Sequence, residues 1–362
     1  MTAPQTEQAA AIVEAALRAA QDLARLPALP APLARLVLRH NAEAVERRFA
    51  AAALTMAEIV DLLAALADRV PAEALVPARA WALMRIEQYG AVAMPPGLPR
   101  ALLRGLGEAV PGPDRALGRA WARQGFREGI WAAGLHRVPL LPLGLNCLPW
   151  NLPARWGFRA AAEAMEAFNP FALASHRLPA VLAALEEGWV GYAPAGGIRS
   201  IATPSGARVL LREDGGAVWN HHTGPHWEED DFATLRLDLE VLARRFERLA
   251  ASPRLPLRVA FLLTEEAAPD AALAERVLAA LRRRARGGRV GLVLLHNPPA
   301  GEAGEAPSPP GRLGPDALLL RVPAPRPGYQ WHLPAHFDTP EGHAFEQRIA
   351  NALRDAVAGW LG

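Results

Sequence analysis

The sequence contains no lysine, and all 39 of its basic residues are therefore arginine. Without a lysine amine, the chain cannot form a Schiff base, attach pyridoxal phosphate, or hold phosphate as P-loop proteins and protein kinases do. Cysteine occurs once, at Cys147. A single cysteine excludes an intrachain disulfide framework and a zinc site with several thiolate ligands, so this thiol can remain reduced.

Serine is scarce, and the familiar glycine-rich motifs are missing. The chain has five serines, and none of them lies in a Gly-x-Ser-x-Gly elbow. No Gly-x-Gly-x-x-Gly follows an expected strand, and Gly196-Gly197 is typical of a turn rather than of a phosphate-binding loop. We therefore predict no cofactor.

Long hydrophobic runs are absent as well. No apolar run approaches the length that spans a bilayer, and residues 1–5 lack the basic and apolar regions of a signal peptide. We therefore expect a cytoplasmic protein with no membrane span. The formal net charge is only +2, and the arginines are scattered among carboxylates apart from a cluster at 282–286. That cluster is typical of a helix C-terminus, so nucleic acid is not an expected partner.

With 362 residues, of which 51% are hydrophobic, the chain is long enough for two domains. Residues 1–135 are rich in Ala, Leu and Arg at helical spacing, and prolines separate the segments. We predict a helical domain there, which serves in packing or binds a protein partner. Its expected helices cover residues 9–26, 33–49, 56–70, 72–89 and 98–109.

From residue 138 onward, short apolar runs alternate with helical segments. This pattern predicts a mostly parallel, three-layer α/β domain over residues 136–362. The strands are expected at 138–143, 208–211, 217–220, 257–263, 289–295 and 317–322. The helices are expected at 153–167, 178–187, 232–251, 271–284 and 340–360. Functional loops then lie beyond the carboxyl ends of the strands, and residues 298–315 are expected to form a mobile surface loop.

Cys147 follows an apolar run and Gly144, and it immediately precedes a helical segment. At such a position, unpaired N–H groups and the helix dipole favour the thiolate, as a nucleophilic cysteine requires. The alternative is a small buried hydrophobic residue, which is a common role for a lone cysteine. A nucleophilic thiol of ordinary pKa also needs a nearby imidazole to take its proton.

Histidines gather in two segments. His221, His222 and His226 follow the third expected strand, while His332 and His336 precede the last helix. Adjacent histidines in an extended segment point to opposite faces, so His221 and His222 are not expected to face one site. Alternatively, the first three histidines and the acidic run that follows them bind a metal ion. The start of the next helix explains the acidic run more simply, and we predict no metal site.

Residues 143–149, Leu-Gly-Leu-Asn-Cys-Leu-Pro, resemble the Ser-Leu-Gly-x-Asn-Cys signature of a bacterial family of uncharacterised proteins labelled papain-like cysteine peptidases. Further segments resemble other parts of that family in the same order, namely residues 169–171, 218–221, 244–249 and 294–298. The resemblance extends from about residue 138 to the C-terminus and leaves the helical region unmatched. It implies that Cys147 is a nucleophile and that His221 is its base.

The chain departs from this family in two places. Ala172 and Leu173 stand where the family has Asp-Trp, and Pro142 stands where it has Ser before Leu-Gly. If the family's Asp orients the histidine or contacts the substrate, this chain uses another group or has lost the activity.

A site of this kind would carry out acyl transfer in two steps, through a thioester on Cys147 that water or another acceptor resolves. The Cys147 N–H and the Asn146 side chain are the expected oxyanion donors. Asp338 is the preferred third group, before Asp230 and Asn220.

The expected substrate is an acyl-bearing peptide or glycan conjugate. The residues predicted to contact it are Trp219, His222, Arg244 and Arg245. The two arginines have an alternative role in ion pairs with Glu240 or Asp238. Two other functions stay open: a non-enzymatic module that binds a protein or glycan, which the missing Asp-Trp favours, and, with less support, a hydrolase that uses a histidine-bound metal.

Overall fold

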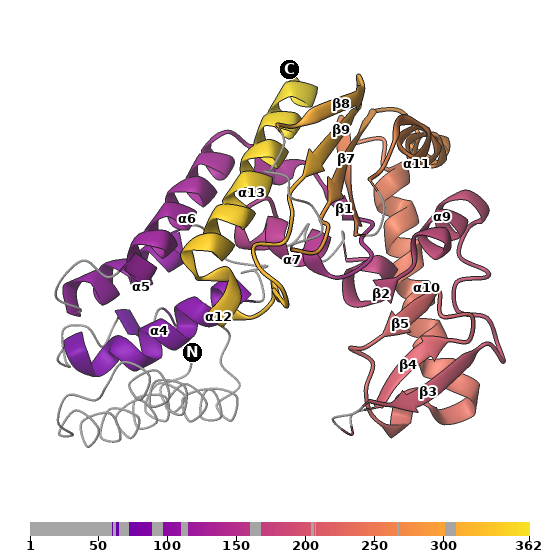
Figure 1. The fold of residues 1–362 in the computed structure, drawn as a ribbon, viewed down its shortest axis with the longest axis horizontal. Helices are drawn as coiled ribbons and strands as arrows, with labels where there is room; N and C mark the ends of the chain where they lie inside the picture. Colours follow the sequence, from indigo (N-terminus) through magenta and orange to yellow (C-terminus); the bar gives the residue numbers. More distant parts are fainter. Residues whose placement is uncertain are drawn as a thin grey trace. The chain divides into compact units, whose positions relative to one another are not determined.

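The computed structural model describes residues 60, 63–64, 72–88, 97–109, 115–159, 168–203, 206, 208–265, 268–300 and 309–362. The chain divides into two compact units, residues 1–128 and residues 129–362. The elements are labelled as in Figure 1. The helices expected at 9–26 and 33–49 lie outside the described residues, as does most of the helix expected at 56–70.

The described part of the first unit is helical. It contains α4 (Ala72–Gln88), α5 (Gly97–Ala109) and most of α6 (Arg115–Ala132). The Glu87 carboxylate is buried and accepts hydrogen bonds from Arg123 at 2.6 and 2.9 Å and from Arg127 at 3.1 Å. Burial alone would raise the pKa of Glu87, but these two guanidinium groups lower it to about 2. The sequence does not predict α6, because glycines and arginines interrupt its apolar positions.

The second unit contains a five-stranded sheet, sheet A. Its strands, in spatial order, are β1 (Leu140–Pro142), β6 (Leu257–Thr264), β7 (Arg289–His296), β9 (Ala317–Arg321) and β8 (Gly311–Gly314). The first four are parallel, and β8 runs antiparallel to β9. β6 is buried along its whole length, which is typical of a parallel strand covered on both faces. The prediction of an α/β fold with a mostly parallel sheet is therefore confirmed.

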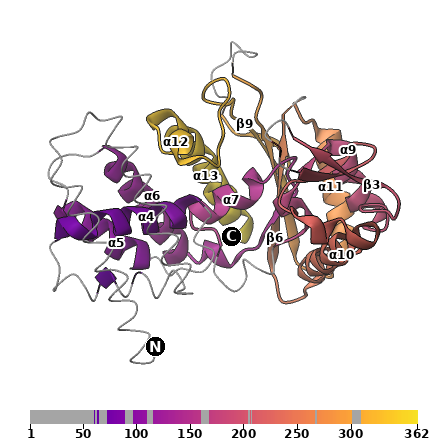
Figure 2. The same ribbon diagram turned by 90° about the horizontal axis from the view of Figure 1, so that it is seen from below.

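Helices cover both faces of sheet A (Figure 2). α7 (Leu148–Arg155) and α13 (Pro340–Leu361) pack on one face, and α10 (Glu229–Ala251) and α11 (Ala271–Arg284) pack on the other. Gly291 in β7 allows the close approach of α13, because a Cβ at this position would lie 2.4 Å from the Trp360 ring. The neighbouring Leu292 points into the core that contains α11 residues.

A second sheet, sheet B, is antiparallel. Its order is β2 (Ser175–His176), β5 (Ala217–Trp219), β4 (Arg208–Arg212) and β3 (Ile198–Ala202), and α9 (Leu178–Glu187) follows β2. The sequence predicts β4 and β5 as members of one parallel sheet, and this is wrong. Only residues 213–216 connect them, which is too short for the crossover that parallel strands need.

Three elements differ from the sequence prediction. β8 lies inside the segment expected to be a loop at 298–315, of which residues 301–308 fall outside the description. α7 begins at Leu148 and ends at Arg155, so it covers only the start of the helix expected at 153–167, of which residues 160–167 lie outside the described residues. A short helix, α12 (Pro334–Phe337), precedes α13. In the part of the chain that the structure describes, no helix has both the length and the apolar character needed to cross a membrane.

Candidate functional site

Cys147 and His221 follow strands of two different sheets and lie next to each other. Cys147 is the N-cap residue of α7, five residues after the end of β1, and His221 lies in the turn that follows β5. β2 connects the two segments, because it pairs with β5 while the His176 N–H donates to the Leu145 carbonyl at 2.7 Å. The end of β5 is thereby held beside the loop that carries the cysteine.

The Cys147 Sγ lies 3.7 Å from His221 Nε2, within hydrogen-bonding distance for sulfur. Cys147 is only 6% exposed, whereas His221 is open to solvent on one side and partly buried on the other. The structure therefore brings together the two residues that the sequence proposes as nucleophile and base.

The electrostatics of the sulfur differ from the sequence expectation. Burial raises the pKa of the Cys147 thiol to about 11, although a backbone hydrogen bond from Ala174 acts in the opposite direction. The start of α7 offers the sulfur few donors, because Asn146 Oδ1 accepts the Leu148 N–H at 2.9 Å and Pro149 has no N–H. The start of α7 was expected to stabilise the thiolate, but burial of the sulfur destabilises the thiolate by more than this.

The pKa of His221 is lowered, first by burial and then by the charges of His222 and His332. With an elevated thiol pKa and a lowered imidazole pKa, the resting pair at neutral pH is a neutral thiol and a neutral imidazole. Such a pair is reactive only when the imidazole accepts the proton as the sulfur attacks.

Asn146 has a structural role in the cysteine loop. Its Nδ2 donates to Glu265 Oε1 at 2.9 Å, while its Oδ1 caps α7. Glu265 directly follows β6, the parallel neighbour of β1, so the loops after the two strands meet at the same edge of sheet A. One part of the amide expected to bind an oxyanion is thus already engaged.

Gly144 is required by close packing in this loop. A Cβ at Gly144 would lie 2.3 Å from the Asn146 carbonyl oxygen and 2.7 Å from the Pro149 ring. No larger residue fits without moving the backbone on either side of Cys147.

His222 contacts a different element from His221. It is 5% exposed, and its Nε2 lies 3.0 Å from Asp238 Oδ2 in α10. His226 is exposed and contacts Trp227. Within the described ranges, no group of three or more His, Cys, Asp or Glu side chains is placed to hold a metal ion, so the geometry gives the metal interpretation no support.

Two of the residues expected to contact a substrate have other contacts in the structure. Trp219 is fully buried in the hydrophobic core, so it is not accessible to a substrate. Arg244 lies on an exposed face of α10 and pairs with Glu240 at 2.5 Å, which is the alternative that the sequence raised. Arg245 follows it on α10 and is half-buried.

The three candidates for an orienting group are widely spread along the chain. Asp338 is the C-cap residue of α12, and its N–H donates to the Pro334 carbonyl. Asp230 has a left-handed backbone with φ 50° at the start of α10. Asn220 is exposed and immediately precedes His221.

His332 has a place in the site that sequence reasoning did not assign. It lies close enough to His221 for its charge to lower the pKa of His221. Its own pKa is lowered by burial, by His336 and by Arg155. The second histidine-rich segment was the signal in the sequence, but only the fold shows which of its histidines affects the pKa of His221.

A buried ion pair anchors the segment that carries His332. Arg155 of α7 pairs with Glu346 of α13, donates to the Trp331 carbonyl at 3.3 Å, and stacks 3.6 Å from the centre of the Phe337 ring. The Trp156 Nε1 donates to the same carboxylate at 2.9 Å. These contacts join residues that are 191 positions apart, so no local pattern predicts them.

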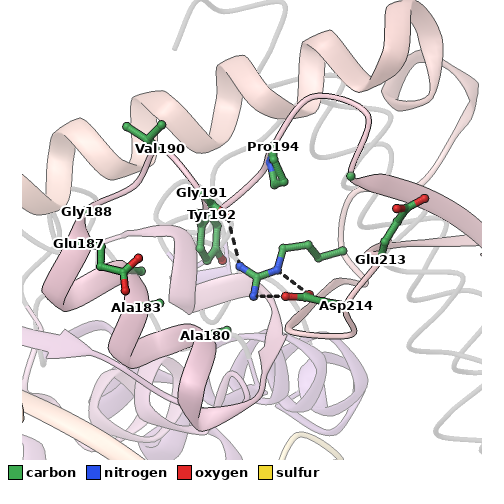
Figure 3. A pocket seen from close by; sticks show the side chains of 13 residues that line it. Ala180, Ala183, Glu187, Gly188, Val190, Gly191, Tyr192, Pro194, Glu213 and Asp214 are labelled. Atoms are coloured by element: carbon green, nitrogen blue, oxygen red, sulfur yellow. Dashed lines mark hydrogen bonds and ion pairs between the residues drawn. The ribbon is translucent and has the colours of Figure 1, made fainter.

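A cavity of about 600 Å³ lies elsewhere in this unit, between α9, the loop after it and the turn between β4 and β5 (Figure 3). Arg212 lines it, and its guanidinium pairs with Asp214 through two contacts of 2.7 Å. Tyr192 lines the cavity, and its hydroxyl lies 2.5 Å from His176 Nε2. The buried His176 and Tyr192 thus lie between this cavity and the cysteine loop.

No protein-family model, no curated protein and no solved structure matches this chain. The resemblance of residues 143–149 to a cysteine-peptidase signature therefore stays a prediction from sequence. Any function has to be argued from the geometry described above.

Proposed function

We propose that this protein is a cysteine-dependent hydrolase or acyltransferase in which Cys147 is the nucleophile and His221 the base. The observation that carries the proposal is the distance of 3.7 Å between Cys147 Sγ and His221 Nε2. These residues are 74 positions apart and come from the ends of strands in two different sheets. A thiol and an imidazole at this distance are the two groups that acyl transfer through a thioester requires.

The reaction begins from the neutral pair. Cys147 Sγ attacks the carbonyl carbon of the acyl donor while its proton passes to His221 Nε2, and the carbonyl electron pair moves onto oxygen. The tetrahedral intermediate collapses, the bond to the leaving group breaks, and His221 returns the proton to that group. Water or another acceptor then attacks the thioester with His221 as base, and the thiol is regenerated.

The developing oxyanion needs hydrogen-bond donors next to the sulfur. The Cys147 N–H, at the start of α7, is the donor closest in sequence to the reacting atom. Asn146 stays the second candidate through the amide hydrogen that does not face Glu265. The acyl donor that we propose is a peptide or a glycan conjugate, and cytoplasmic location and partner binding by the N-terminal helices are further proposals from sequence.

Labelling by an iodoacetamide probe between pH 5 and pH 11 tests the pair. In the wild-type protein, we expect the rate to rise with a midpoint below 6.5 as His221 loses its proton, to level off near neutral pH, and to rise again toward pH 11 as the thiolate forms. His221→Ala is expected to lower the rate at pH 7 by at least about a hundredfold and to keep the alkaline rise. Cys147→Ala removes labelling.

His226→Ala is the matched control, because His226 is an exposed histidine in the same turn. This variant is expected to label like the wild type. Formation of an acetyl thioester from p-nitrophenyl acetate, read by intact mass, then tests acyl transfer itself. Equal labelling of the wild type and His221→Ala at pH 7, with no acetyl adduct, contradicts the proposal.

The alternative function is a non-enzymatic module that binds a protein or a glycan. The observation that favours it is the burial of the sulfur, which is 6% exposed and has its pKa raised to about 11. In that case, Cys147 is a packing residue, and its alkylation depends on pH only through the thiol. The same pH profile separates the two functions, because only the enzyme has the acidic midpoint.

A further inference from the structure

His222 is the most constrained histidine in the turn after β5. Its ring is 5% exposed and makes an edge contact with Trp227, with ring centres 4.7 Å apart. Its Nε2 lies 3.0 Å from Asp238 Oδ2, so this nitrogen carries a proton that it donates to the carboxylate. The other nitrogen, Nδ1, is buried and has no hydrogen-bond partner among the described residues. One polar contact therefore decides how this ring is oriented.

Asp238 lies on a helix that is fixed by packing against the core. It lies on α10, next to Leu239 and one turn after Leu235, and both leucines are buried in the hydrophobic core. The turn that carries the histidines contacts the same helix along the segment 225–227. A histidine held to this helix fixes the backbone of the turn on one side.

His221 and His222 are consecutive residues after β5, so a contact that holds the backbone at His222 also limits where the ring of His221 can lie. With His222 directed to α10, His221 is directed to Cys147, where its Nε2 lies 3.7 Å from the sulfur. We infer that His222 and Asp238 form a positioning pair that holds His221 against Cys147. This inference rests on the proposed function.

The pair also bears on the charge of His221. His222 lies within reach of its neighbour, and so does His332, which is itself next to His336 and Arg155. A proton on both rings of the turn places two positive charges on consecutive residues, and the Asp238 carboxylate offsets the charge on His222 only. A neutral side chain at residue 222 is therefore expected to make His221 easier to protonate.

The experiment compares four variants by their pH profile of Cys147 labelling with the iodoacetamide probe. His222→Ala and Asp238→Ala lose the contact, and we expect the rate at pH 7 to fall by about tenfold to a hundredfold because His221 is no longer held in place. His222→Gln keeps an amide donor in the place of Nε2 but has no charge. We expect it to restore most of the rate at pH 7 while its acidic midpoint moves to higher pH than in the wild type.

Glu240→Ala is the matched control on the same helix, because Glu240 is exposed and its ion pair among the described residues is with Arg244, one turn further on. It is expected to leave the profile unchanged. If His222→Ala does not fold, Asp238→Ala still tests the inference, because the Asp238 side chain is 41% exposed and its removal breaks the same contact without emptying the core.

Failure of the positioning pair and failure of the proposed function give different results. If His221→Ala slows labelling while the His222 and Asp238 variants match the wild type at every pH, the positioning pair is wrong and the proposed function stands. If His221→Ala itself labels like the wild type, the proposed function fails. A His222→Gln variant as slow as His222→Ala, with an unmoved midpoint, also overturns the inference.

Discussion

At the scale of single residues, the site is decided by burial and close contact rather than by residue type. Cys147 has the sequence context of an activated thiol, yet loss of solvent raises its pKa to about 11. Asn146 and Pro149 also leave few free N–H groups at the start of α7 that could offset this loss. Reactivity at neutral pH then depends on contact with His221, and that contact depends on the backbone between residues 144 and 149.

Gly144→Ala tests this dependence. The added Cβ would lie 2.3 Å from the Asn146 carbonyl oxygen, so the loop must shift and Cys147 must move relative to His221. We expect labelling at pH 7 to fall by about tenfold and the free energy of unfolding to fall by about 1–3 kcal/mol. Probe labelling and urea denaturation measure the two effects.

Gly191→Ala is the control for that variant, because a Cβ at Gly191 meets no atom within 4 Å. Its free energy of unfolding is expected to change by less than about 0.5 kcal/mol, with unchanged labelling. A Gly144→Ala protein with normal labelling would show that the loop tolerates the extra group and that the Cys147–His221 contact does not depend on it.

At the scale of elements, α7 connects the nucleophile to the segment that carries His332. Arg155 at its C-terminal end pairs with Glu346 of α13, and both side chains are at most 1% exposed. Removal of one partner of a buried ion pair leaves an uncompensated charge, which costs far more than the pair contributes.

Glu346→Ala is therefore expected to lower the free energy of unfolding by about 3–5 kcal/mol. Chemical denaturation followed by tryptophan fluorescence measures it. Asp355→Ala on the same helix is the control: Asp355 is 67% exposed and pairs with Arg354, so its loss is expected to cost less than about 1 kcal/mol. Similar losses for the two variants would mean that Arg155 finds another partner.

The elements also show which parts of the fold can be predicted from the local hydrophobic pattern of the sequence. The aliphatic runs at β6 and β7 and the helices α9, α11 and α13 follow from periodicity, because each buries a face that the sequence displays. β2 has two residues and β3 is mostly exposed, so neither carries a hydrophobic signal. They are strands because β2 pairs with β5 and β3 pairs with β4, and not because of their own composition.

At the scale of the whole molecule, His176 and Cys147 are two of the buried groups that make stability depend on pH. Burial and the charge of Arg212 lower the pKa of His176 to about 3, and burial raises that of Cys147 to about 11. Below about pH 6.5, His176 is protonated in the unfolded chain but stays neutral in the folded protein, so unfolding takes up a proton. Above about pH 8.5, the unfolded thiol loses a proton that the folded state keeps.

Stability is therefore expected to be greatest between about pH 6.5 and pH 8.5. Below this range, His176 reduces the free energy of unfolding by about 1.4 kcal/mol per pH unit, and Cys147 removes about 2–3 kcal/mol by pH 11. Urea denaturation across pH 4–10.5 measures both slopes. Cys147→Ala is expected to flatten the alkaline slope alone, and an unchanged slope in that variant would mean that the folded thiol ionises normally.

The sequence by itself determined which chemistry is excluded, where most buried strands and helices lie, and which cysteine and histidine are candidates for a site. Those conclusions follow from residue type and local periodicity, which do not depend on distant contacts. Only the tertiary structure decided that β4 and β5 form an antiparallel sheet, that Trp219 is buried, that His222 binds Asp238, and that Arg155 pairs with Glu346. Apart from the pairing of β4 with β5, which a short turn connects, these contacts join residues of separate elements, and the burial that follows is what changes the pKa values at the site.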